Sequence, residues 1–72
     1  MVVYRYATLL REPWPGAVPR DGLIDCGYTK GKTPSGRNCW GWVEYNRKLT
    51  EEEISHYELE YVIEIDIKNF AG

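Results

Sequence analysis

Residues 40–67 read WGWVEYNRKLTEEEISHYELEYVIEIDI, and their pattern predicts a strand, a capped helix and a second strand. Thr50 and Glu53 have the spacing of a capping box, in which each side chain bonds the backbone N–H of the other residue at a helix start. Leu49 and Ile54 have the spacing of the hydrophobic staple that accompanies such a box. The predicted helix is short and covers about residues 51–58.

Strands are predicted on both sides of this helix. Over residues 40–47 the side chains alternate between two faces. Over residues 59–68 apolar side chains occupy the odd positions from 61 onward, and charged side chains occupy most even positions. This alternation predicts that the odd residues are buried against Ile54 and Tyr57 of the helix, with the charged face in solvent.

The segments before residue 40 supply the rest of the predicted fold. Residues 1–10 are apolar and rich in β-forming residues, which predicts a strand buried on at least one side. Residues 11–22 hold three prolines and two glycines, which predicts a semi-rigid loop around Trp14. Residues 23–29 fit a short strand or a single helical turn equally well. Residues 30–38 are basic and contain glycine, so we expect a mobile loop there.

Together these elements predict one α+β domain over residues 1–72. Its antiparallel sheet is small, with three or four strands, and the short capped helix of residues 51–58 packs on one face. The linker between the last two strands is just long enough for a parallel crossover, but the commoner antiparallel arrangement is preferred. A chain of 72 residues allows only a small core, and its three Trp and six Tyr oppose disorder.

Charge is distributed unevenly along the chain. Residues 1–50 hold eight Lys and Arg against four Asp and Glu, residues 51–72 hold one against seven, and the net charge is −2. Such a chain can neutralise itself, pair head to tail with a copy, or present one face to a charged partner. The sequence leaves these three alternatives open.

Neither a targeting segment nor a membrane span is visible in the sequence. Residues 1–10 lack the long apolar run of a signal peptide, and no apolar run approaches the roughly 20 residues that a bilayer requires. We therefore expect a cytoplasmic protein with no membrane partner. In that compartment Cys26 and Cys39 are expected to be free thiols, although a disulfide between them stays an alternative.

The sequence shows no set of residues typical of catalysis or of a metal site. Residues 27–33 resemble a phosphate-binding loop, but three residues separate the two glycines instead of four, and Pro34 opposes the helix that should follow. Cys26, Cys39 and His56 lack the paired spacing of zinc ligands. We therefore expect no catalytic residue, no metal and no cofactor, and we do not expect an enzyme.

The three tryptophans can either pack in the small core or form an interface, and the sequence leaves both open. Trp and Arg are enriched at the energetic centres of protein interfaces. The candidate partner-binding residues are Trp14, Lys32, Arg37, Trp40 and Trp42. The sequence therefore predicts a protein-binding or self-associating accessory module, whose partner is another protein or a second copy. The alternative is a module that binds single-stranded nucleic acid through Tyr4, Tyr6, Trp42, Lys32 and Arg37, which the negative net charge opposes.

The segment over residues 40–60 resembles one found in short proteins of unknown function from Gram-positive bacteria. It is also similar to small domains of large polyvalent proteins carried by the phages and conjugative elements of these bacteria. The resemblance implies a bacterial cytosol, an accessory role and a place on a mobile element. It implies no site residue, because these proteins share no agreed activity.

Overall fold

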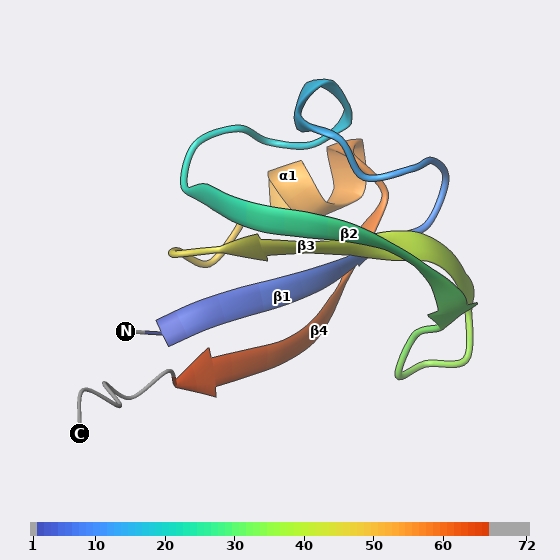
Figure 1. Cartoon of the computed structure of the whole chain (residues 1–72). Coiled ribbons are helices and arrows are strands. Elements are labelled where there is room, and N and C mark those ends of the chain that lie inside the picture. Colours follow the sequence, from blue (N-terminus) through green and yellow to red (C-terminus); the bar gives the residue numbers. More distant parts are fainter. Residues whose placement is uncertain (1, 67–72) are drawn as a thin grey trace.

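A computed structural model describes residues 2–66 of the chain. Four strands form one curved sheet, and a short α-helix and one turn of 3-10 helix complete the fold (Figure 1). The elements in chain order are β1 (Val2–Thr8), η1 (Pro15–Ala17), β2 (Leu23–Lys32), β3 (Asn38–Tyr45), α1 (Glu51–His56) and β4 (Leu59–Asp66). The predicted α+β class is therefore confirmed.

The sheet has the strand order β2-β3-β1-β4, and each pair of neighbours is antiparallel. The predicted antiparallel sheet is therefore confirmed. Because β1 lies between β3 and β4 and opposes both, β3 and β4 run in the same direction. The connection through α1 consequently crosses over β1. The preference for an antiparallel arrangement of the last two strands over a crossover is therefore wrong, although every hydrogen-bonded ladder is antiparallel.

The start of α1 has the predicted capping box. The Thr50 hydroxyl accepts a hydrogen bond from the Glu53 backbone N–H at 3.1 Å, and the Glu53 carboxylate accepts one from the Thr50 N–H at 2.9 Å. Arg47 also donates two hydrogen bonds to this carboxylate, at 2.9 and 2.8 Å. The Arg47 and Thr50 donors lower the pKa of Glu53 to about 2. The helix ends at His56, earlier than predicted, because Glu58 adopts a left-handed backbone (φ 53°) that stops it.

One face of the sheet is covered by the loop around η1 and by the segment that enters α1. The core cluster consists of Tyr6, Val18, Val43, Tyr45, Leu49 and Leu59. The Tyr45 hydroxyl donates to the Pro19 carbonyl at 2.6 Å, and burial raises the pKa of this phenol. The Tyr6 hydroxyl accepts a hydrogen bond from the Leu49 N–H at 3.0 Å. These two hydroxyls are thus paired, which avoids the cost of burying them alone, whereas the hydroxyl of buried Thr8 has no hydrogen-bond partner among the described residues.

The predicted burial of the odd residues in β4 is wrong. Tyr61 and Ile63 are 44% and 49% exposed. The cause is a bulge at Val62: Arg5 pairs with Ile63, whereas the next residue of β1, Tyr6, pairs with Tyr61. A one-residue shift moves later side chains to the other face, so the odd residues are divided between both faces. The prediction for Ile67 lies outside the described residues.

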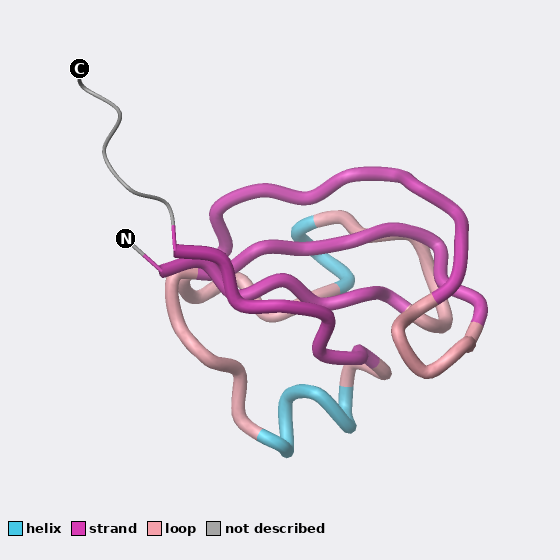
Figure 2. Tube along the Cα trace, turned by 90° about the horizontal axis from the view of Figure 1, so that it is seen from below, coloured by secondary structure: helices cyan, strands magenta, loops and turns pink. Residues whose placement is uncertain are grey.

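The predicted mobile loop over residues 30–38 is also wrong in its extent. Strand β2 continues to Lys32, so only residues 33–37 form the turn between β2 and β3. The Thr33 N–H bonds the Arg37 carbonyl at 2.8 Å, and the Ser35 hydroxyl donates to Glu60 of β4 at 2.7 Å. The β2–β3 hairpin bends at its tip to make this contact (Figure 2). Residues 23–29, which fitted a strand or a helical turn, are strand.

Candidate functional site

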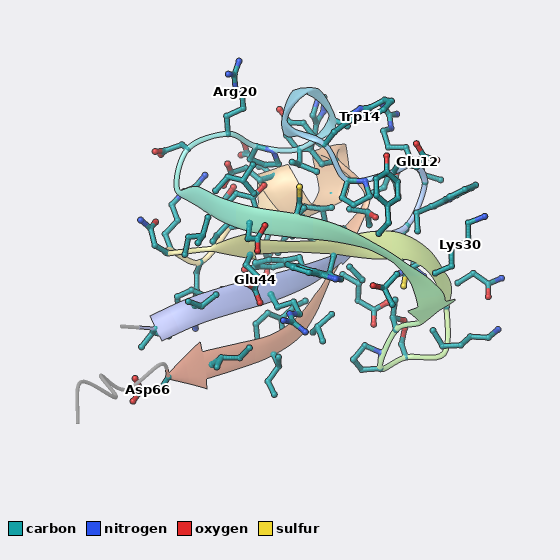
Figure 3. All side chains as sticks on the ribbon, viewed as in Figure 1. Glu12, Trp14, Arg20, Lys30, Glu44 and Asp66 are labelled. Atoms are coloured by element: carbon teal, nitrogen blue, oxygen red, sulfur yellow. The ribbon has the colours of Figure 1, made fainter. Side chains whose placement is uncertain are left out.

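Large apolar side chains gather in solvent at the end of the sheet where β2 and β3 bend. Leu10, Trp14 and Trp40 are 59%, 55% and 37% exposed. They line one groove of about 380 Å³, the tryptophan groove, whose lining comprises Leu10, Arg11, Glu12, Trp14, Gly16, Ala17 and Trp40. Figure 3 shows Trp14, Glu12 and Lys30 at this end of the molecule. Clusters of exposed apolar side chains mark interaction sites more often than single ones do.

The loop that carries Trp14 is fixed to the sheet on both sides of it. On one side Pro13 is buried against Gly41 of β3, where an added Cβ would lie 2.7 Å from the Pro13 Cγ. On the other side Val18 enters the core, and the Ala17 N–H donates to the Trp14 carbonyl at 2.8 Å. The absence of a side chain at Gly41 therefore lets the loop lie close to β3, which brings Trp14 beside Trp40.

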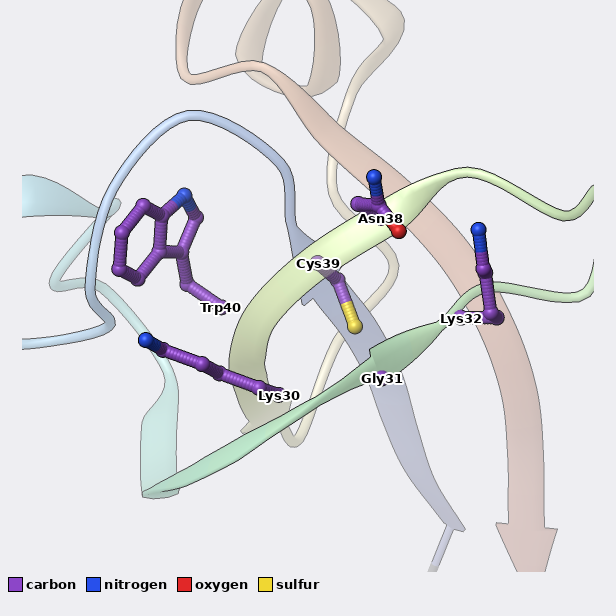
Figure 4. A pocket seen from close by; sticks show the side chains of 6 residues that line it. All are labelled: Lys30, Gly31, Lys32, Asn38, Cys39 and Trp40. Carbon is purple, nitrogen blue, oxygen red and sulfur yellow. The ribbon is translucent and has the colours of Figure 1, made fainter.

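A second groove, of about 470 Å³, lies on the other side of Trp40 (Figure 4). Its lining comprises Lys30, Gly31, Lys32, Asn38, Cys39 and Trp40, and we call it the lysine groove. The Lys30 ammonium lies 4.7 Å from the centre of the Trp40 ring, a cation–π distance. A bulge in β2 accounts for this placement, because Tyr28 pairs with Gly41 but Gly31 pairs with Cys39.

Apart from the single acid Glu12, six large or charged residues lie around these grooves, and we call them the tryptophan surface: Leu10, Arg11, Trp14, Lys30, Lys32 and Trp40. Three of the five residues predicted to bind a partner are among them, namely Trp14, Lys32 and Trp40. Leu10, Arg11 and Lys30 were missed. The sequence contains no signal for Lys30, because the bulge that turns it towards Trp40 depends on strand pairing.

Trp42, the fourth predicted residue, belongs to a different cluster. Its ring lies against the backbone of Gly27 in β2, where an added Cβ would overlap the indole. The Arg5 guanidinium lies 4.8 Å from the centre of the ring and donates to Glu44 at 2.9 Å through Nε. Trp42 therefore holds β1, β2 and β3 together.

Arg37, the fifth predicted residue, lies in the turn between β2 and β3. Its guanidinium is 3.7 Å from the carboxylate of Glu60, which also accepts hydrogen bonds from Ser35. These contacts, those from Ser35 foremost, lower the pKa of Glu60. Arg37 is therefore part of the contact between the hairpin tip and β4.

The predicted stacking of nucleic acid on Tyr6 is wrong. Tyr6 is 2% exposed, and its ring packs edge-on against Tyr45 and Tyr61. Tyr4 is half-buried and packs against the same core. The Tyr6 ring therefore cannot accept a base on its face, so a nucleic-acid site would have to use other aromatic residues.

Cys26 and Cys39 are free thiols, as expected from the sequence. Within residues 2–66, no three His, Cys, Asp or Glu side chains gather at metal-binding distance. No helix in this part of the chain is long and apolar enough to cross a membrane.

Comparison with protein families gives a match over most of the chain. The family model described as Defence against restriction A C-terminal matches residues 1–63. The match covers β1, β2, β3 and α1 and continues to Ile63 in β4, so it includes the whole tryptophan surface. Comparisons with curated proteins and with solved structures found no significant match.

Proposed function

Because the chain belongs to the family described as Defence against restriction A C-terminal, we propose that it is a small accessory domain that acts in defence against restriction by binding another protein. The proposal is for a binding module rather than an enzyme, in the bacterial cytoplasm. Restriction acts on unmodified incoming DNA, so a mobile element is where such a domain is useful. The Gram-positive origin implied by the resemblance stays a prediction.

The observation that carries the proposal is the exposure of Trp14 and Trp40 on one groove. A domain of this size has few large side chains, and burying them is its main source of stability. Two of its three tryptophans are nevertheless more than one-third exposed. Tryptophan is the residue type most typical of interface hot spots, where a few large side chains supply most of the binding free energy.

The partner could also be a second copy of the chain. The uneven charge of the chain permits pairing with a copy. The sheet permits it too, because within residues 2–66 its terminal strands β2 and β4 each pair with one neighbour. We favour a different protein, because Glu60, an acid that a second copy would offer to the cations of the tryptophan surface, already accepts hydrogen bonds from Ser35 and faces Arg37 in its own chain.

Single-stranded nucleic acid is the second candidate ligand. The observation that favours it is the pair of lysines beside Trp40 in the lysine groove. The position of Lys30 against the Trp40 ring opposes it, since a stacked base would need the place that the ammonium occupies. Protein binding therefore remains the favoured function.

The test is the establishment of an unmodified plasmid in a host with an active restriction system. We expect expression of the chain to raise the number of transformants relative to an empty vector, and the double variant Trp14→Ala, Trp40→Ala to remove this gain. Ile63→Ala, which truncates an exposed side chain on β4, is the control and should keep it. No gain with the wild-type chain, or an equal gain with the double variant, would contradict the proposal.

A further inference from the structure

Trp40 separates two grooves of different chemistry. The tryptophan groove offers Leu10, Trp14 and Ala17 as apolar walls. The lysine groove offers the hydrocarbon stems and ammonium groups of Lys30 and Lys32, and both of its charged side chains are cations. A ligand that crosses Trp40 therefore meets an apolar site first and a cationic site next.

The charge around Trp40 is opposite to that of the whole chain. Arg11, Lys30 and Lys32 line the two grooves together with one acid, Glu12, which accepts a hydrogen bond from Tyr28 at 3.1 Å. This gives three cations against one anion, whereas the chain as a whole carries −2. A local excess of one sign attracts ligands of the other sign and orients them as they approach.

The position of Lys30 favours a carboxylate ligand over a nucleic acid. Its ammonium is 4.7 Å from the centre of the Trp40 ring, so a nucleobase that stacks on this ring face would have to displace it. A carboxylate has no such need, since it can bind the solvent side of the same ammonium while the cation–π contact stays in place. The apolar walls of the neighbouring groove also match a hydrophobic side chain better than a ribose or a phosphate.

From this arrangement we infer that the partner presents an acidic peptide segment with a large apolar side chain. The apolar side chain enters the tryptophan groove between Leu10 and Trp14, and neighbouring carboxylates pair with Lys30 and Lys32. This inference rests on the proposed function and names the chemistry of the partner at the same surface.

A selection from a random dodecapeptide library displayed on phage, against the full chain, tests the inference. We expect the enriched peptides to carry net negative charge and at least one aromatic or large aliphatic residue. Synthetic copies should bind less tightly as salt is raised, because exposed ion pairs are screened. A labelled oligothymidine of about 15 nucleotides serves as the nucleic-acid probe and should not bind through Trp40.

Two sets of variants assign the binding to the two grooves. Lys30→Gln with Lys32→Gln should weaken the selected peptides by roughly fivefold to thirtyfold, as expected for the loss of two exposed ion pairs. Trp40→Ala should weaken them by roughly thirtyfold or more, as at an interface hot spot. Lys48→Gln is the matched charge control, because Lys48 is exposed and lines neither groove.

The outcomes separate this inference from the proposed function. Peptides that need Trp14 and Trp40 but are neutral or basic, or that bind the lysine variant unchanged, would overturn the inference and leave the proposed function standing. Failure to enrich any peptide that depends on these tryptophans would overturn both. Binding of the oligothymidine that is lost in Trp40→Ala would replace the acidic peptide with nucleic acid.

Discussion

Trp14, from the loop before β2, and Trp40, from β3, line the same groove although they are far apart in the sequence. Their proximity depends on a third residue, because the loop can approach β3 only where Gly41 presents no side chain to Pro13. The site is therefore built by a close backbone contact, and the following predictions test that contact and the contacts that support it.

Gly41→Ala should destabilise the domain and displace Trp14. The new methyl group would lie 2.7 Å from the Pro13 Cγ and would also overlap the Gly27 carbonyl. Overpacking of this kind costs about 1–3 kcal/mol. Urea denaturation measures the loss of stability. The affinity for the selected peptides should also fall, by more than the smaller fraction of folded protein explains. Unchanged stability would show that the loop does not rest on Gly41.

Gly27→Ala should destabilise the sheet, because the added methyl group overlaps the ring of Trp42. The ring would have to leave its position beside Arg5, at a cost of about 1–3 kcal/mol. Gly31→Ala, in the same strand, is the control, since nothing lies within 4 Å of its added Cβ. Equal free energies of unfolding for the two variants would contradict the packing of Trp42 described above.

The bond between Arg47 and Glu53 should make stability depend on pH in the acid range. The pKa of Glu53 is about 2 in the folded chain, below its usual 4.5, so the folded state favours the ionised form. Its contribution is complete above pH 4.5 and is lost as the pH falls towards 2. Because both side chains are partly exposed, we expect about 1 kcal/mol.

Glu53→Gln should therefore lower the free energy of unfolding at pH 7 and flatten its fall between pH 4.5 and 2. Glu52→Gln, the neighbouring exposed carboxylate, is the control. Parallel pH profiles for the wild type and Glu53→Gln would count against this ion pair.

Glu60→Gln should loosen the tip of the β2–β3 hairpin. The carboxylate accepts two hydrogen bonds from Ser35 and faces Arg37, and these contacts lower the pKa of Glu60. Backbone amides in residues 33–37 should exchange hydrogen faster in the variant, while amides in β1 keep their protection. Glu64→Gln, on the same strand, should leave the exchange in the turn as in the wild type.

Signals within a few residues of each other predicted local structure well. The capping box of Thr50 and Glu53 and the entry of Leu49 into the core follow from spacing alone. The bulge at Val62 could not be foreseen, because both possible registers place apolar residues on the core face. The same limit applies to β2, whose bulge decides where Lys30 lies.

The sequence predicts which types of residue form the candidate site, but not which of them lie next to one another in the fold. Exposed Trp14 and Trp40 match the expected interface residues, and Lys32 lies beside them. Alternation along β3 predicts that Trp42 and Trp40 share one face, but it does not show that Gly27 of the neighbouring strand leaves room for the Trp42 ring. Such contacts depend on which strands become neighbours.

The central claim is that Trp14 and Trp40 serve a partner rather than the core, and the free energy of unfolding of the double variant Trp14→Ala, Trp40→Ala tests it most directly. Truncating a single core tryptophan costs about 3–5 kcal/mol. The exposure of both side chains predicts a loss of less than about 3 kcal/mol for the pair in urea denaturation at pH 7. A larger loss would show that the two tryptophans are part of the core and would contradict the account.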